Sequence, residues 1–221
     1  MFTPNPVCLE ELVHRFLQQL QQAHWYEIVA VLAGIASVWF SRMENTWVYP
    51  VGLINTTIYI YISLAYHLPG EACVNVYYTV MSVYGWYMWL KKDASDRKLL
   101  SIAFSGRQMW IYQLLFFSFF YVVIYFALVY LKENFFEGAI PWGDAFASAT
   151  AFTGMWLMTR KKVESWYWWI LTNVASIPLF YSKGLVLTSI YYFILLVMAF
   201  SGLAAWRRKA KKAGPAKGSP P

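Results

Sequence analysis

Residues 39–50 have the sequence WFSRMENTWVYP, and residues 156–169 have the sequence WLMTRKKVESWYWW. In both stretches a Trp is followed by a hydroxyl residue with Arg, then by Glu, and then by a second Trp. The likeness resumes downstream, because Val-Tyr-Tyr precedes Gly-x-x-x-Trp at 85–89 and Ile-Tyr-Tyr precedes the same element at 202–206. Both copies lie among apolar segments of membrane-spanning length. Duplicated membrane bundles are typical of transporters, whose two halves rock about a shared site near the bilayer midplane.

The composition identifies an integral membrane protein. The chain has 221 residues, of which 59% are hydrophobic, 20% aromatic and only 13% charged, unlike a soluble domain. Its uninterrupted apolar runs predict seven transmembrane helices, each near the ~20 residues that cross a hydrocarbon core. The predicted spans are residues 25–41, 47–67, 73–90, 109–131, 141–159, 166–182 and 185–206.

The basic residues predict the orientation in the membrane. Of the 18 Lys and Arg residues, 15 fall in the C-terminal tail or in the connections after the first, third and fifth spans, and only Arg15, Lys132 and Lys183 fall on the opposite face. This bias predicts an N-terminus outside and a C-terminus in the cytoplasm. The net charge of +7 is therefore explained by orientation. We expect the basic tail to contact anionic headgroups of the lipid bilayer rather than nucleic acid.

The duplication predicts an all-α integral membrane protein with seven transmembrane helices in a 3+1+3 arrangement. Residues 25–90 form the first three-helix repeat, 91–131 a basic cytoplasmic loop and connector helix, and 141–206 the second repeat. The first and fifth spans are four crossings apart and so run in the same direction, which gives parallel repeats of the full-length SWEET-like kind. Residues 1–24 predict an amphipathic helix at the outer interface, with packing against the bundle or a neighbouring subunit as the alternative. Residues 207–221 are predicted to be a basic, disordered cytoplasmic tail.

The polar residues exclude several kinds of chemistry. Cys8 and Cys73 lack the spacing of a metal or redox site, so neither a metal nor another cofactor is expected. No acidic, basic or His side chain falls at mid-depth of a span, which disfavours proton coupling, and no phosphate-binding loop is present for ATP hydrolysis. Passive, bidirectional passage is the simplest mechanism, and sodium coupling is the less favoured alternative. An intramembrane enzyme is disfavoured, because it would need a nucleophile–base pair or metal ligands at depth, and the spans contain neither. A seven-helix receptor is also disfavoured, because it would not need the duplication.

Trp166, Trp169 and Asn173 are the main candidate ligand contacts. Their spacing of three and four residues places them on one face of a helix, descending from the interface. Two indole faces above an amide suit a flat, positively charged heteroaromatic ring, held by stacking and cation–π attraction of ~1–2 kcal/mol when desolvated. An interfacial aromatic belt is the alternative for the two Trp residues. Asn55 in the second span and Tyr84 in the third are further candidates, with helix packing as their alternative role.

These elements resemble the bacterial PnuC family of vitamin transporters, whose best-known members carry nicotinamide riboside. The resemblance rests on ENTWVYPVG at 44–52, on VYY at 76–78 with YGWY at 84–87, and on W-x-x-W-x-x-x-N at 166–173. It covers roughly residues 25–208 of the chain.

The resemblance implies a homotrimer in the bacterial cytoplasmic (inner) membrane, with seven helices and a separate pathway in each protomer. It also implies facilitated diffusion, made one-way by phosphorylation of the substrate in the cytosol. The substrate-binding role carries over to six residues: Trp166, Trp169, Asn173, Trp47, Asn55 and Tyr84. The family also contains thiamine carriers, and thiamine too presents a flat cationic ring. Nicotinamide riboside is therefore the predicted substrate, and thiamine is the alternative.

Overall fold

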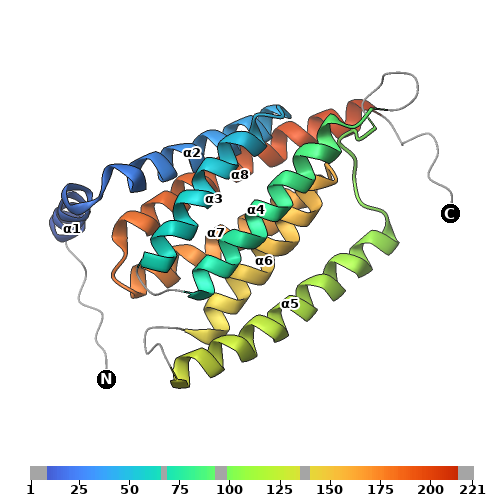
Figure 1. The fold of residues 1–221 in the computed structure, drawn as a ribbon. Helices are drawn as coiled ribbons and strands as arrows, with labels where there is room; N and C mark the ends of the chain where they lie inside the picture. The colour runs from blue at the N-terminus through green and yellow to red at the C-terminus, as the bar shows by residue number, and fades with distance from the viewer. Residues whose placement is uncertain (1–8, 66–68, 93–98, 135–139, 214–221) are drawn as a thin grey trace.

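The computed structural model describes residues 9–65, 69–92, 99–134 and 140–213, which form eight α-helices (Figure 1). The helices are α1 (Leu9–Gln22), α2 (Trp25–Met43), α3 (Val48–Ala65), α4 (Pro69–Leu90), α5 (Arg107–Asn134), α6 (Pro141–Thr159), α7 (Ser165–Ser182) and α8 (Val186–Ala213). Helices α2 to α8 coincide, in chain order, with the seven predicted apolar spans. Helix α1 lies on the predicted amphipathic segment.

Hydropathy distinguishes the outer helices from the inner ones. Within the described residues, α2, α5 and α8 are long and apolar enough to cross a membrane, with mean hydropathies of 1.3, 2.4 and 2.0, and α3 is apolar but shorter. Helix α6 is buried along most of its length and carries small or hydroxyl side chains such as Thr150, Thr153 and Gly154. A helix surrounded by other helices does not contact lipid, and its small residues let neighbouring helices approach closely. The burial of α6 therefore accounts for its weaker hydropathy.

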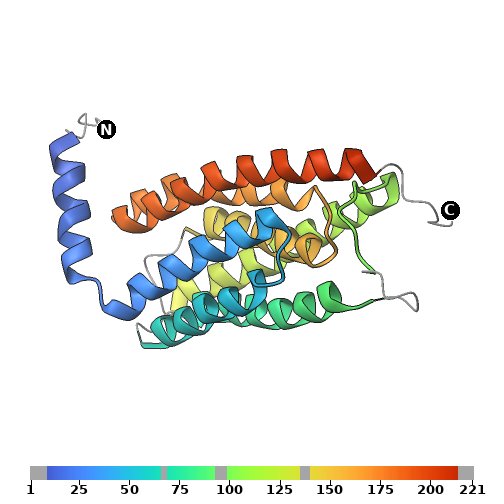
Figure 2. The same cartoon turned by 90° about the horizontal axis from the view of Figure 1, so that it is seen from above.

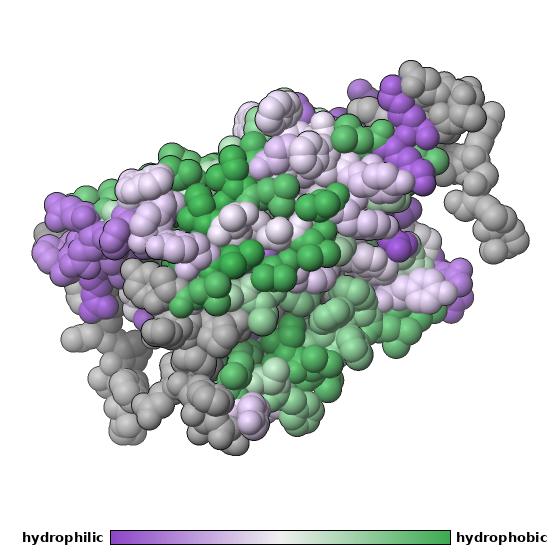
Figure 3. All heavy atoms as spheres, viewed as in Figure 1, coloured by the Kyte–Doolittle hydropathy of each residue, from purple (hydrophilic) through white to green (hydrophobic). Residues whose placement is uncertain are grey.

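The helices form two sequential groups of three. Helices α2, α3 and α4 pack against one another in chain order, as do α6, α7 and α8, and the groups meet where α4 packs on α6 and α2 packs on α8. Helix α5 lies along α6 at the edge of the bundle (Figure 1). The space-filling view shows apolar side chains over α5 and the middle of the bundle, with hydrophilic ones concentrated toward the ends (Figure 3).

Helix α1 lies across one end of the bundle (Figure 2). Its Gln19 amide donates to the carbonyl of Gly184 at 2.8 Å and accepts from the N–H of Leu187 at 2.9 Å. The two hydrogen bonds fix α1 to the turn between α7 and α8. The neighbouring positions Val13, Leu17 and Leu20 remain exposed, so α1 keeps an apolar face directed away from the bundle.

The opposite end of the bundle is the basic end, where α2, α4, α6 and α8 finish. Helix α8 continues to Ala213, so residues 207–213, predicted as part of a disordered tail, are helical, and residues 214–221 lie outside the described chain. Two effects account for the longer helix. Lys211 and Lys212 complement the negative end of the helix dipole. Lys209 donates to the carbonyl of Met43 and to Glu44, each at 3.1 Å.

Contacts at the basic end recur at a constant separation in sequence. The Ser41 hydroxyl donates to the sulfur of Met158 at 3.0 Å, and these two residues are 117 positions apart. The indole of Trp89 donates to the Met158 carbonyl at 3.1 Å, while that of Trp206 donates to the Ser41 carbonyl at 3.0 Å. Trp89 and Trp206 have the same separation. Each three-helix group therefore ends on the first helix of the other group, through equivalent bonds.

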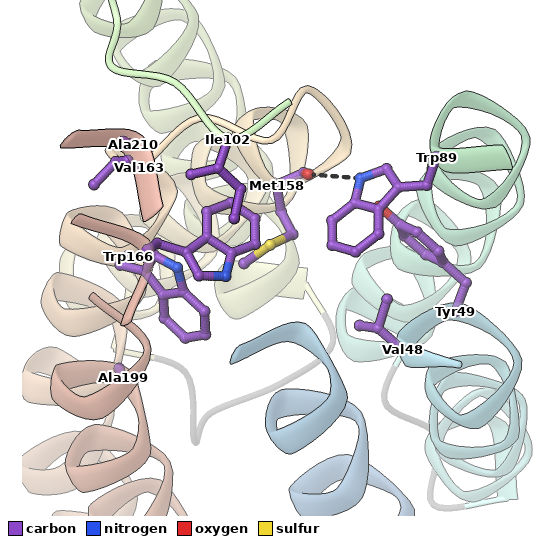
Figure 4. Close-up of a cluster of buried hydrophobic side chains, with 10 residues drawn as sticks. Val48, Tyr49, Trp89, Ile102, Met158, Val163, Trp166, Ala199 and Ala210 are labelled. Atoms are coloured by element: carbon purple, nitrogen blue, oxygen red, sulfur yellow. Dashed lines mark hydrogen bonds between the residues drawn. The ribbon is translucent and has the colours of Figure 1, made fainter. Parts of the chain in front are cut away.

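The same separation relates two ring–glycine contacts in this region. The Tyr49 ring lies against Gly85, and the Trp166 ring lies against Gly202, each where a Cβ would clash. Each ring also meets a neighbouring Trp edge to face. The distance between ring centroids is 5.2 Å from Tyr49 to Trp89 and 5.7 Å from Trp166 to Trp206. These side chains belong to one buried cluster (Figure 4). The two contacts show that Tyr49, and not Trp47, occupies the place equivalent to Trp166.

Candidate functional site

The aromatic face of α7 extends from the basic end into the bundle. Trp166 is its outermost member and is 1% exposed, packed between Gly202 and Trp206. Its indole N–H has no hydrogen-bond partner within the described chain. In this structure Trp166 is therefore a packing residue that closes the basic end above the next turn of α7.

Trp169 lies one turn further into the bundle and is partly buried. Its ring lies flat on α6, because a Cβ added at Gly154 would come within 3.2 Å of the indole. Tyr78 of α4 also packs near Trp169, with 6.3 Å between the two ring centroids. Phe152 of α6 meets the Tyr78 ring edge to face at 6.1 Å. Three helices thus contribute three aromatic rings, of which the Tyr78 ring contacts the other two, and we call these rings the aromatic cluster.

Tyr77 packs against the aromatic cluster through its contacts with Phe152. Its ring stacks on Phe152 with 3.9 Å between centroids and an interplanar angle of 20°. Its hydroxyl donates to the Phe152 carbonyl at 3.0 Å. Because Phe152 is fixed by both a stacked ring and a hydrogen bond, α4 and α6 hold a defined spacing beside Trp169.

Asn173 is the polar group on this face of α7. Its side chain is 3% exposed, and it makes no hydrogen bond with any of the described residues. The neighbouring Thr172 differs, since its hydroxyl is within hydrogen-bonding distance of the Thr150 hydroxyl and of the Trp168 carbonyl, each at 3.0 Å. Buried amides are nearly always hydrogen-bonded, but the polar atoms of Asn173 are not completely enclosed and so do not carry the cost of a fully buried unpaired group. An amide kept in this condition, one turn below Trp169, is suited to bind a ligand.

The other three predicted site residues lie apart from the aromatic cluster. Asn55 donates to the Ala30 carbonyl at 2.7 Å and contacts Gly34, so its amide already joins α3 to α2. Trp47 precedes α3, is 60% exposed, and lines a shallow surface depression with Trp86. Tyr84 is also exposed. The structure therefore brings together Trp169 and Asn173, with Trp166 directly above them, and separates the other three.

Tyr78 and Phe152 were not among the predicted site residues. Tyr78 belongs to the repeated Val-Tyr-Tyr element, but the sequence alone does not show which of its two tyrosines faces inward. Phe152 is one of 16 Phe residues and has no distinctive spacing. Its nearest signal is Gly154, since a glycine in a helix interior indicates that another group approaches the backbone closely.

The strongest charge interactions lie outside the aromatic cluster. At the basic end, Lys161 binds Glu44 at 2.8 Å, and at the other end Lys183 binds Asp144 at 2.5 Å. Burial tends to raise the pKa of Glu44, but hydrogen bonds and the charges of Lys161 and Lys209 outweigh burial and hold this pKa below its ordinary value of 4.5. The described residues contain no group of three or more His, Cys, Asp or Glu suited to hold a metal ion. The rings of the aromatic cluster offer stacking surfaces, and the Asn173 amide offers hydrogen bonds to a ligand.

The helical bundle has an apolar exterior suited to a membrane, and comparison with known proteins assigns the chain to the class of membrane transporters. Residues 24–208 match the family described as "Nicotinamide mononucleotide transporter". The chain belongs to this family of transporters, which is not a family of enzymes.

Curated relatives and a solved structure agree with this assignment. The nicotinamide riboside transporter PnuC of Escherichia coli (strain K12) is 25% identical over 210 residues, covering 86% of this chain and 88% of the relative. The riboflavin/roseoflavin transporter RibM of Streptomyces davaonensis is 22% identical over 197 residues, covering 87% and 89%. The fold is similar to that of the "Crystal structure of the Vitamin B3 transporter PnuC", with a TM-score of 0.66, 21% identity and coverage of 91% and 90%.

Proposed function

We propose that the protein carries nicotinamide riboside across the bacterial cytoplasmic membrane by facilitated diffusion. The observation that carries the proposal is the contact of the partly buried Trp169 and Tyr78 rings, with the Asn173 amide one helical turn further along α7. The relatives from E. coli and Neisseria mucosa are named nicotinamide riboside transporters. Phosphorylation of the nucleoside in the cytosol would add charge and keep it from returning.

The chemistry of the site suits this substrate. A pyridinium ring is flat and cationic, so it gains from stacking on an indole and from cation–π attraction, ~1–2 kcal/mol when desolvated. The carboxamide on that ring has donors and an acceptor that complement those of Asn173. Helix α7 contains no Asp, Glu, Lys, Arg or His, which supports passive carriage without a proton relay. Trp166 would cover the site on the side of the basic end.

The architecture proposed for this function has two parallel repeats, α2–α4 and α6–α8, joined by α5 in a SWEET-like 3+1+3 plan. It is supported by the equivalent contacts at a separation of 117 residues, such as that of Ser41 with Met158. Two equivalent residues that touch each other must lie beside the pseudo-twofold axis. The axis would then pass between the ends of α2 and α6, along the membrane normal.

The concentration of basic residues supports an N-terminus outside and a C-terminus in the cytoplasm. The basic end would then face the cytoplasm, and its buried cluster would close the exit from the site in this structure. Alternating access requires this cluster to part so that the substrate can leave. A homotrimer remains a prediction from the family resemblance, to be tested by the mass of the purified protein in detergent.

The named relatives do not favour thiamine as the substrate, since they carry nicotinamide riboside or riboflavin according to their names. The decisive measurement is direct binding of nicotinamide riboside, riboflavin and thiamine to the purified protein, followed by counterflow in proteoliposomes. We expect saturable binding and exchange of nicotinamide riboside. Preference for riboflavin or thiamine would overturn the substrate proposal.

The site itself is tested with Trp169→Ala. Loss of the indole removes the stacking surface, so binding should weaken about tenfold or more and saturable uptake should be lost. Trp25→Ala removes an equally large but exposed side chain at the start of α2 and serves as the matched control. Unchanged binding in Trp169→Ala, with expression and elution like wild type, would exclude the aromatic cluster as the site.

A further inference from the structure

Among the described side chains of helix α5, one polar group is fully buried, although the others are largely apolar and exposed. Gln113 is 0% exposed, while its neighbours Tyr112, Leu114 and Leu115 are exposed. A buried amide on an apolar helix is costly unless both of its ends are hydrogen-bonded. Gln113 is therefore a residue whose place in the sequence needs a specific reason.

Both ends of the Gln113 amide are hydrogen-bonded, and they join two parts of the protein. Its Oε1 accepts from the indole Nε1–H of Trp168 on α7 at 2.9 Å. Its Nε2 donates to the hydroxyl of Ser105, in the segment before α5, at 2.9 Å. The amide thus connects the connector helix to α7 on one side and to the preceding loop on the other.

The connection continues to the start of α7. Ser105 donates through its hydroxyl to Glu164 Oε2 at 2.7 Å and through its backbone N–H to Oε1 at 2.9 Å. Glu164 immediately precedes α7. A pairing of extended backbone beside it, from Ala103 N–H to the Lys161 carbonyl at 3.2 Å and from Val163 N–H to the Ala103 carbonyl at 3.1 Å, holds the two loops together. Gln113, Ser105, Glu164 and Trp168 form a closed polar chain around the first turn of α7.

Trp168 is the member of the polar chain that lies next to the aromatic cluster, because Trp169 follows it in the sequence. It is buried, and its ring packs on Phe117 of α5 at 5.2 Å between centroids. Trp168 and Trp169 are consecutive residues of one helix, so any rotation of α7 that moves one indole moves the other. Fixing Trp168 against α5 therefore fixes the direction in which Trp169 and Asn173 project.

The first half of the chain has no matching constraint. At the separation of 117 residues that relates the two halves, the counterpart of Trp168 is Val51, whose side chain has no hydrogen-bonding group. Glu164 likewise corresponds to Trp47, which is exposed. The polar chain is therefore a feature of the half that carries the aromatic cluster, rather than a general element of the repeat.

We propose that Gln113 is a positioning residue for substrate binding, which acts through the Trp168 indole to set the rotation of α7 and hence the placement of Trp169 and Asn173. This inference rests on the proposed function. It assigns a role in substrate affinity to a residue on the connector helix that lies outside the aromatic cluster.

The test is a double-mutant cycle on the dissociation constant for nicotinamide riboside and on the KM and maximal rate of counterflow. Gln113→Leu removes both hydrogen bonds, and Trp168→Phe removes the indole donor while keeping an aromatic ring. Each single variant should raise the dissociation constant and KM about fivefold to tenfold, in line with one buried hydrogen bond. The maximal rate should stay within about twofold of wild type. The double variant should bind no more weakly than Gln113→Leu alone, because Gln113→Leu already breaks the bond that Trp168→Phe removes.

Gln108→Leu is the matched control, since Gln108 is an exposed glutamine of the same helix whose amide donates to the Tyr112 hydroxyl at 3.0 Å. Affinity should be unchanged in this control. Ser105→Ala opens the other arm of the polar chain and should raise the dissociation constant in the same direction by a smaller factor. It also keeps the proposal testable if Gln113→Leu does not fold.

Two results would overturn the proposal: a dissociation constant within twofold of wild type in both Trp168→Phe and Ser105→Ala, or fully additive effects of Gln113→Leu and Trp168→Phe. A loss of maximal rate with KM unchanged would also contradict it, because that pattern indicates fewer folded carriers. The parent hypothesis fails in a different way, through unaltered binding in Trp169→Ala. Normal affinity in the Gln113 and Trp168 variants together with loss in Trp169→Ala would reject the positioning role alone.

Discussion

Glu44 and Lys161 bind each other at 2.8 Å although they are 117 residues apart. Both have left-handed backbone conformations, with φ of 62° and 53°, and each lies just after the first helix of a three-helix group. They are therefore equivalent residues of opposite charge that meet where the two groups touch. Lys161 is 1% exposed at its side chain and lies over the Trp89 ring at 4.7 Å, while the second oxygen of Glu44 accepts from Lys209.

Glu44→Gln should destabilise the protein more than the removal of an ordinary surface charge. It removes the carboxylate charge that binds the buried Lys161 ammonium at 2.8 Å, at an expected cost of about 1–3 kcal/mol. Lys209→Gln is the matched control, because this lysine bonds to the same carboxylate but is more exposed, and its loss should cost under about 1 kcal/mol. Thermal unfolding of the detergent-solubilised variants measures both. Equal shifts in the two variants would show that burial of Lys161 contributes nothing.

The same carboxylate predicts a pH dependence of stability. Because the pKa of Glu44 is below its ordinary value of 4.5 in the folded protein, its ion pairs stabilise the fold above that value and are lost as pH falls through the folded-state pKa. The stability difference between wild type and Glu44→Gln should therefore be largest near neutral pH and shrink below about pH 4.5. Unfolding midpoints measured from pH 3 to 7 test this. A difference independent of pH would contradict it.

Cross-linking tests whether the basic end opens during transport. Ser41 and Met158 touch at 3.0 Å, so cysteines at both positions should be joined by a short bifunctional thiol reagent, after Cys8 and Cys73 have been replaced by Ser. If the substrate leaves through this end, counterflow should fall to background in the double variant and persist in Ser41→Cys treated alone. Full counterflow in the cross-linked protein would place the exit elsewhere.

Gly154→Ala separates binding from stability. Its Cβ would lie 3.2 Å from the Trp169 ring, which must move by a few tenths of an ångström, so we expect nicotinamide riboside to bind several-fold more weakly. Stability should hold or rise, since alanine is favoured over glycine in a helix by roughly 1 kcal/mol. Gly106→Ala is the control, because nothing lies within 4 Å of its added Cβ. Unchanged affinity in Gly154→Ala would mean that the placement of Trp169 on α6 does not matter.

The sequence was most informative where regular periodicity decides the structure. The apolar runs predicted the positions of α2 to α8, and the spacing of Trp169 and Asn173 predicted their shared face, because both follow from helix geometry. The register that aligns the two repeats was harder to predict from the sequence. Matching Trp with Trp aligned Trp47 with Trp166, whereas the glycine contacts pair Trp166 with Tyr49. Side-chain identity had misled the alignment by two residues, and only packing against Gly85 and Gly202 corrected it.

Long-range hydrogen bonds also lay beyond sequence analysis. Asn55 and Asn173 are both amides on the second helix of a three-helix group, and the sequence did not distinguish them. In the structure, the Asn55 amide donates to the Ala30 carbonyl, whereas Asn173 makes no hydrogen bond with any described residue. The difference depends on which carbonyl of a neighbouring helix comes within reach, and local periodicity carries no information about that distance.

Replacement of Asn173 should therefore separate function from stability most clearly. Asn173→Leu removes an amide that gives up no hydrogen bond within the described chain, so the unfolding midpoint should stay level or rise. Nicotinamide riboside would lose its amide partner, and binding should weaken about tenfold or more. Thr172→Val, the control one residue away, breaks the bond to Thr150 and should lower stability by about 1 kcal/mol with a smaller effect on affinity. If Asn173→Leu instead unfolds the protein and leaves the affinity of the folded fraction unchanged, the amide is a structural element and the substrate's polar group is bound elsewhere.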